Sequence, residues 1–171
     1  MKTINLVKYL ATSLLVFCIA LTFAASTKAV SANTIESSDS ATSPSDLLGT
    51  FLLECAEGIA NSKLIFTQNK IVQEDTYFKS GTNCTEKEGT LTLTQTIEYP
   101  GGTSATAHGE ALHINYTLIA ATSDGDNIFD STSVDYSIIL LDGNKLYVAN
   151  GMGRSPEKRP TELKDTFFTK Q

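Results

Sequence analysis

The chain has 171 residues, with 13 basic and 19 acidic side chains, a net charge of −6 and 41% hydrophobic residues. This hydrophobic content suffices for one packed domain and excludes a wholly disordered chain. The acidic balance argues against nucleic-acid binding and against docking on anionic lipid, because both need a concentrated basic surface. With two histidines and no Cys-x-x-Cys motif, the chain offers few zinc ligands, and we expect no metal and no cofactor.

Residues 1–32 have the pattern of a secretory signal peptide. A basic start and an apolar stretch over residues 10–25 precede Val30-Ser31-Ala32, which supplies small residues for cleavage. The apolar stretch is shorter than the ~20 residues that cross a bilayer, and no stop-transfer pattern follows it. We therefore expect cleavage after Ala32, a secreted or periplasmic protein, and no stable membrane insertion after cleavage.

The next segment, residues 33–46, is rich in Ser and Thr, which predicts a disordered leader before a single folded domain over residues 47–171. Outside the signal peptide only Cys55 and Cys84 remain. In an exported chain an even cysteine pair is typical of a disulfide, because the compartment is oxidising. Their wide spacing and the lack of an adjacent basic residue argue against a reactive thiol. We expect a structural disulfide.

From Gly49 onward the chain alternates apolar and polar residues with a period of two, which indicates β-strands. The expected strands cover residues 49–54, 63–68, 71–80, 90–99, 111–121, 134–141, 145–149 and 165–170. Such alternation is typical of antiparallel sheets with one solvated face. About eight short strands predict an all-β fold, an antiparallel up-and-down barrel, with a β-sandwich as the second choice.

The parity of three of these strands predicts which side chains point inward. The expected inward residues are Leu91, Leu93, Ile97 and Tyr99, then Leu112, Ile114, Tyr116 and Leu118, and finally Val134, Tyr136, Ile138 and Leu140. Within residues 90–96, the positions of opposite parity are all threonines. Threonine forms strands well and is common on an exposed strand face.

Candidate sites on polar residues are weak. The acidic loop over residues 124–130 could supply oxygen ligands to calcium, but Ile128 interrupts the EF-hand spacing and no glutamate closes the loop. A solvated turn is the alternative. His108 and His113 are five residues apart, so a single strand would place them on opposite faces. No Gly-x-Ser-x-Gly motif occurs, and we assign no catalytic residue.

Several short motifs carry a resemblance to a known family. They are Gly49-Thr50-Phe51, Asn83-Cys84-Thr85, residues 142–147, residues 159–163 and residues 168–171. Together they resemble small secreted bacterial proteins with a lipocalin-like β-barrel. Lipocalins carry Gly-x-Trp in the first strand and an arginine near the last strand that packs across it. Here Phe51 stands at the Trp position, and Arg159 is the expected counterpart of the arginine. The resemblance implies a calyx-like barrel and the binding of an apolar ligand.

The first functional hypothesis is an exported, disulfide-stapled barrel that binds a small apolar ligand. The candidate calyx residues are Phe51, Leu64, Phe66, Leu93, Tyr116, Tyr136 and Ile138. The second hypothesis is a surface or envelope interaction module without a cavity, which binds a protein partner, because a barrel of eight strands can be filled by its own side chains. An enzyme is a distant third hypothesis, since the sequence shows no nucleophile–base pair.

Overall fold

The computed structural model describes residues 42–171 except Glu57 and Ile59. The predicted signal peptide, residues 1–32, and the leader up to residue 41 lie outside the described residues. The strands are β1 (Gly49–Ala56), β2 (Ala60–Phe66), β3 (Lys70–Phe78), β4 (Lys87–Glu98), β5 (Thr103–Thr106), β6 (Gly109–Ser123), β7 (Asp126–Asn127), β8 (Val134–Asp142), β9 (Lys145–Ala149) and β10 (Leu163–Lys170). A single 3-10 turn, η1 (Pro156–Lys158), lies between β9 and β10.

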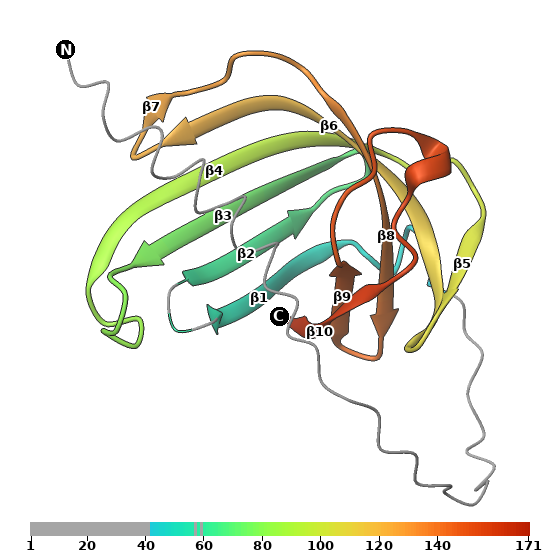
Figure 1. Ribbon diagram of the computed structural model, residues 1–171, viewed down its shortest axis with the longest axis horizontal. Helices are drawn as coiled ribbons and strands as arrows, with labels where there is room; N and C mark the ends of the chain where they lie inside the picture. The colour runs from blue at the N-terminus through green and yellow to red at the C-terminus, as the bar shows by residue number, and fades with distance from the viewer. Residues whose placement is uncertain (1–41, 57, 59) are drawn as a thin grey trace, which may run out of the picture. The chain divides into compact units, whose positions relative to one another are not determined.

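The antiparallel strands form a closed barrel (Figure 1). Neighbours follow the order β4-β3-β2-β1-β10-β9-β8-β6, and β6 pairs back with β4 to complete a ring of eight. The short strands β5 and β7 pair with β6 outside this ring. The predicted all-β antiparallel barrel is confirmed. Its eight strands correspond one to one with the expected strands.

The long strand β6 closes the ring because it serves two neighbours along its 15 residues. Residues 112–117 pair with β8, whereas residues 115–123 pair with β4. A register shift between Thr94 and Gln95 of β4 interrupts the second ladder. A bulge of this kind bends the strand and increases its twist, and closure of a sheet requires both.

Two hydrophobic clusters stabilise the barrel, one inside it and one on its outer surface. The interior cluster contains Leu47, Phe51, Leu64, Phe66, Ile71, Ile97, Leu112, Ile114, Tyr116, Ile139, Leu146 and Phe168. The outer cluster contains Ala111, Ile138, Leu140, Tyr147, Ala149 and Leu163. The segment between β9 and β10 is tied to this outer face, since the Tyr136 N–H donates to the Gly153 carbonyl and the Arg159 guanidinium donates to the Ile114 and Ser137 carbonyls.

The orientation predicted for β8 is wrong. Ile139 is paired with Leu112 and both belong to the interior cluster, whereas Ile138 belongs to the outer one. The residues with the outward parity are Val134, Tyr136, Ile138 and Leu140. Residues 137–140 are all buried, so β8 is covered on both faces. A strand of this kind has a continuous apolar run, and its parity does not distinguish inside from outside.

The N-terminal segment closes one end of the barrel, which we call the closed end. The Leu47 side chain is fully buried in the interior cluster. The Thr42 hydroxyl accepts a hydrogen bond from the Leu141 N–H and donates one to the Leu141 carbonyl. The Lys170 ammonium donates to the Asp46 carbonyl at 2.7 Å. The folded domain therefore begins no later than Thr42, rather than at Leu47.

Lys170 occupies the position that the lipocalin resemblance implied for Arg159. Its ammonium lies 5.5 Å from the centre of the Phe51 ring, and the two residues are paired between β1 and β10. Arg159 instead lies over Tyr136 on the outer face and donates to the Asn115 side chain. The expectation that Arg159 packs across the first strand is therefore wrong.

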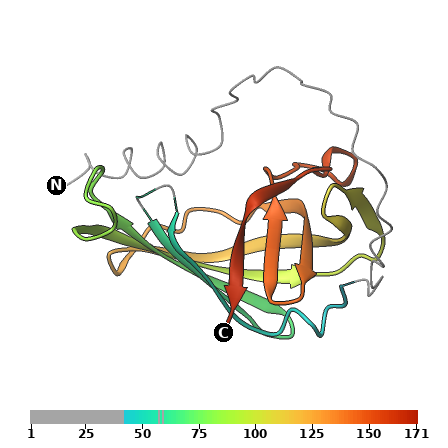
Figure 2. The same cartoon turned by 90° about the horizontal axis from the view of Figure 1, so that it is seen from below.

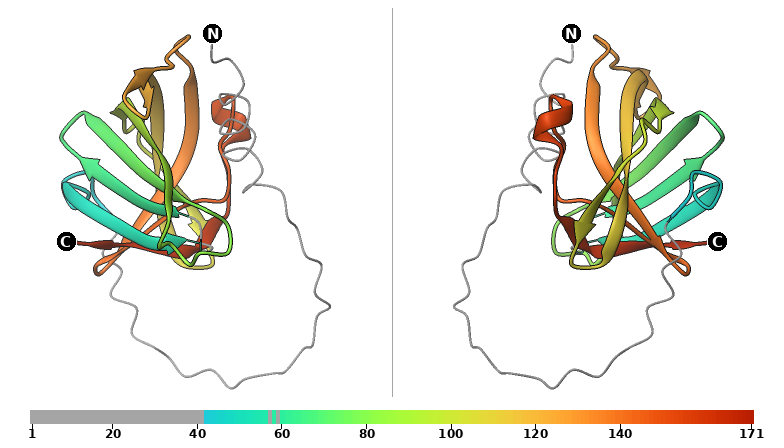
Figure 3. Two further views of the ribbon diagram at one scale, coloured as in Figure 1. Left: turned by 90° about the vertical axis from the view of Figure 1, so that its left-hand side faces the viewer. Right: turned by 90° about the vertical axis from the view of Figure 1, so that its right-hand side faces the viewer.

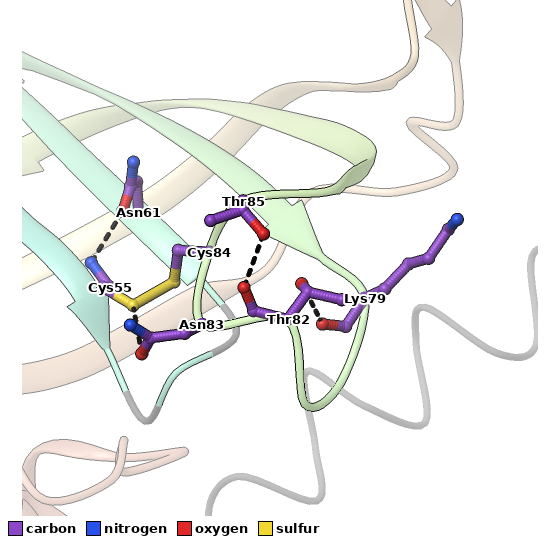
Figure 4. Close-up of a disulfide and its surroundings, with 7 residues drawn as sticks. All are labelled: Cys55, Asn61, Lys79, Thr82, Asn83, Cys84 and Thr85. Carbon is purple, nitrogen blue, oxygen red and sulfur yellow. Dashed lines mark hydrogen bonds between the residues drawn. A yellow bond between two sulfur atoms is a disulfide. The ribbon is translucent and has the colours of Figure 1, made fainter.

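The opposite end, which we call the disulfide end, carries the predicted Cys55–Cys84 bond. Their Cα atoms are 5.7 Å apart, within the range of protein disulfides. The bond links the end of β1 to the loop between β3 and β4 (Figure 4). The Cys55 N–H donates to the Asn61 side chain, and the Thr82 and Thr85 hydroxyls donate to backbone carbonyls of the loop. The disulfide prediction is confirmed.

Candidate ligand-binding site

The interior of the barrel differs between its two ends. Near the closed end the inward side chains are buried, as in the row of Phe51 and Leu64 and the row of Phe66 and Ile71. Toward the disulfide end most inward positions are only partly buried, whereas Asp75, Gly89 and Ala121 are buried. The partly buried positions include Leu53, Ser62, Gln73, Tyr77, Leu91, Leu93 and Ser123. Several inward side chains are therefore more exposed toward the disulfide end than near the closed end, and we call this second region the open half.

The open half exists because the strands differ in length. β8 begins at Val134, which is paired with Thr117, whereas β4 and β6 remain paired as far as Leu91 and Ser123. Figures 1 and 2 show β3, β4 and β6 extending beyond β8, β9 and β10. Figure 3 shows the same strands from the disulfide end in its left panel and from the opposite side in its right panel. Only one wall of the barrel continues into the open half.

The Asp75 carboxyl is the one buried acidic group among the described residues. It lies on β3 and shares its inward row with Ser62 of β2 and Leu91 of β4. Only 6% of the residue is exposed. One oxygen, Oδ2, accepts hydrogen bonds from Gln73 Nε2 at 2.7 Å and from the Tyr77 hydroxyl at 3.5 Å. The other, Oδ1, is buried without a hydrogen-bond partner within the part of the chain that the structure describes.

An unsatisfied carboxyl oxygen is unfavourable in a protein interior, because the group loses hydration without replacing it. Burial accordingly raises the pKa of Asp75, and hydrogen bonding with Ser62, Gln73 and Tyr77 opposes this shift. Burial, and then the negative charge of Asp75, raise the pKa of Tyr77 to about 12. The Tyr77 hydroxyl therefore stays protonated at neutral pH and remains a hydrogen-bond donor to the carboxylate.

The barrel wall is open between β1 and β10. These strands are paired only at Phe51–Lys170 and Leu52–Thr169, and β10 separates from β1 beyond this point. An open hollow of about 650 Å³ lies there on the outer face, since Leu52, Glu54, Phe167 and Thr169 have the outward parity of their strands. It is lined by Leu52, Leu53, Glu54, Asp165, Thr166, Phe167, Thr169 and Gln171. Leu53 shares an inward row with Ser62 and Asp75, so the carboxyl lies two strands, or about 10 Å, from the hollow.

The predicted calyx residues fall into three groups. Phe51, Leu64, Phe66 and Tyr116 point inward and are buried in the interior cluster, where they fill the closed half. Leu93 points inward and is partly exposed in the open half. Tyr136 and Ile138 point outward, so their assignment to the calyx is wrong.

Sequence reasoning missed Gln73, Asp75 and Tyr77. Their position in β3 could have identified them as inward residues, because they share the parity of the buried Ile71. Their polar character obscured that parity, since inward positions were identified by apolar side chains.

Other polar clusters lie away from the barrel interior. Ser104 Oγ is 2.9 Å from His113 Nε2, a pair that the sequence did not reveal. Burial and the charge of Arg159 lower the pKa of His113, and no carboxylate is hydrogen-bonded to it among the residues described. Neither residue lines the hollow. This Ser–His pair lacks the third group that orients the base of a triad.

The acidic loop has a structural role. Asp124 Oδ1 accepts hydrogen bonds from the backbone N–H and the hydroxyl of Thr90, which fastens the loop to β4. Over residues 42–171, leaving aside 57 and 59, no group of three or more His, Cys, Asp or Glu side chains is placed to hold a metal ion. In the same residues, no helix has the length and apolar character needed to span a membrane.

Comparison of the chain with protein-family models and with curated proteins finds no match.

Proposed function

We propose that this protein is an exported, lipocalin-like binding protein that holds a small apolar ligand in the open half of its barrel. The observation that carries this proposal is the contrast along the interior, where one half is filled and the other keeps partly exposed inward leucines.

Two further features support an exported binding protein. The Cys55–Cys84 bond is of the kind that persists in oxidising compartments, in agreement with the signal-peptide pattern of residues 1–32. The bond also links the end of β1 to the loop between β3 and β4 at the disulfide end. A fixed rim keeps a binding site preformed, which lowers the entropic cost of binding.

The test uses the protein recovered from its own host. Native mass spectrometry is expected to show a stoichiometric extra mass that organic solvent removes. After this extraction, the uncharged fluorescent dye Nile red is expected to bind saturably at one site. The substitution Leu93→Trp fills the open half and is expected to abolish dye binding, whereas Thr94→Trp, on the outer face of the same strand, leaves binding unchanged.

A bare mass together with no saturable dye binding would overturn the proposal. The cavity-free interaction module would then be the better description of the protein.

A further inference from the structure

We infer that Asp75 is the recognition group of this site, and that the ligand is a small cationic amphiphile whose protonated amine binds the Asp75 carboxylate. This inference rests on the proposed function and specifies the ligand class for the same site.

The hydrogen bonding of Asp75 is incomplete in one specific way. Gln73 and Tyr77 both donate to Oδ2, and hydrogen bonding with Ser62 also lowers the pKa of the carboxyl. Oδ1 is nevertheless buried and accepts no hydrogen bond of standard geometry within the described part of the chain. A carboxylate only accepts hydrogen bonds, and a protonated amine only donates them. The atom that Asp75 lacks is therefore a donor hydrogen, and an amine supplies it together with a neutralising charge.

No cation of the described chain neutralises Asp75. Ion pairs among residues 42–171, without 57 and 59, include Lys63 with Glu74, Lys79 with Glu86 and Arg154 with Asp135. No cation is among the groups that shift the pKa of Asp75. The groups nearest to Asp75 on its own and neighbouring strands are Ser62, Gln73, Tyr77 and Leu91. A buried charge without a counterion is costly, which favours a cationic donor over a neutral hydroxyl.

The surroundings of the carboxyl suit an amphiphile, because apolar side chains lie next to the polar group. Leu91 is paired with Asp75, and Leu93 is paired with Gln73, so two partly exposed leucines flank the polar group. The hollow on the outer face carries Glu54 and Asp165, but the Lys145 ammonium lies 4.7 Å from the centre of the Phe167 ring in the same hollow, so its charge is mixed.

The experiment compares three probes of equal chain length, namely dodecylamine, dodecanol and dodecanoate. Each probe displaces Nile red from the extracted protein at neutral pH, below its micellar concentration. We expect dodecylamine to displace the dye at a concentration at least about tenfold lower than dodecanoate and several-fold lower than dodecanol, because a buried charge pair discriminates by that order.

The variant Asp75→Asn is expected to weaken dodecylamine binding about tenfold and to leave dodecanol binding within about twofold, because it removes the charge and keeps the shape. The matched control is Glu74→Gln, which removes the same charge from the outer face of the same strand. This control is expected to retain the full preference for the amine. A thermal melt of each variant verifies that it is folded.

The outcomes separate this inference from the proposed function. Equal displacement by all three probes, or an amine preference that persists in Asp75→Asn, would overturn the inference while dye binding still supports a ligand site. Equal losses of amine and alcohol binding in Asp75→Asn would overturn the assignment of a cation. A lack of any dye binding would overturn the proposed function, and the inference with it.

Discussion

The closed half and the open half of the barrel differ in how many strands enclose them and in how deeply their inward side chains are buried. In the closed half, inward residues such as Phe51 and Ile114 are fully buried and contact one another in a single cluster. In the open half, the inward positions combine partly exposed leucines with a carboxyl that has an unsatisfied oxygen. The interior of the barrel thus contains a closely packed apolar region and a second region whose inward side chains are more polar and more exposed.

The first test of this division compares two leucines in one inward row. Leu64 and Leu93 are both paired with Gln73 of β3, from opposite sides. Leu64 is buried, and Leu64→Ala should lower the free energy of unfolding by about 2–5 kcal/mol, through lost burial and the resulting cavity. Leu93 is partly exposed, and Leu93→Ala should cost about 1 kcal/mol or less. Urea denaturation measures both, and equal losses would contradict the division.

The second test removes the disulfide from the open half. Cys55 and Cys84 are separated by 29 positions, and a bond over that span stabilises a protein by about 2–4 kcal/mol, mainly by restricting the unfolded chain. The double substitution Cys55→Ser and Cys84→Ser should lower the free energy of unfolding by this amount in urea denaturation. It should also weaken Nile red binding, because the loops at the disulfide end lose their link. A double variant as stable as the native protein would show that the bond has no structural role.

The fold could be predicted from the sequence wherever one face of a strand is buried and the other is solvated. Strand β4 is the clearest example, because Leu91 and Leu93 point inward while the threonines between them point outward. The orientation of β8 could not be predicted, because residues 137–140 are buried on both faces and no alternation remains. Strands β5 and β7 were missed because four and two residues are too few to show a period.

The candidate site was harder to predict than the fold. The disulfide could be predicted, since two cysteines in an exported chain have one pairing. The parity of β3 could have placed Asp75 inward, but a sequence does not reveal that a carboxyl is buried without a counterion. The contact of Lys170 with Phe51 was missed for a similar reason, since the register between β1 and β10 decides which cation reaches the ring.

The smallest expected effect is that of Asp75→Asn. This substitution should raise the free energy of unfolding at neutral pH, whereas the substitutions above should lower it. Because burial raises the pKa of this carboxyl above its ordinary value of 3.8, the folded protein binds the proton more tightly than the unfolded chain does. The resulting stability is fully present below the unfolded pKa and is lost as the pH rises through the folded pKa. An asparagine at position 75 does not ionise, so the variant Asp75→Asn does not lose stability as the pH rises. It should therefore be more stable than the native protein at neutral pH, by about 1 kcal/mol.

Urea denaturation with and without dodecylamine tests this prediction at neutral pH and again below pH 3.8, the ordinary value of the carboxyl. The advantage of Asp75→Asn should vanish at the acidic pH, where the native carboxyl is also uncharged. It should shrink when the amine is added at neutral pH, because the ligand stabilises only the protein that binds it. Glu74→Gln should give no comparable gain in stability, since Glu74 forms an exposed ion pair with Lys63.

If Asp75→Asn proved less stable than the native protein at neutral pH without ligand, the carboxylate would be part of the packed structure. The inward side chains of the open half would then stabilise the fold, as those of the closed half do.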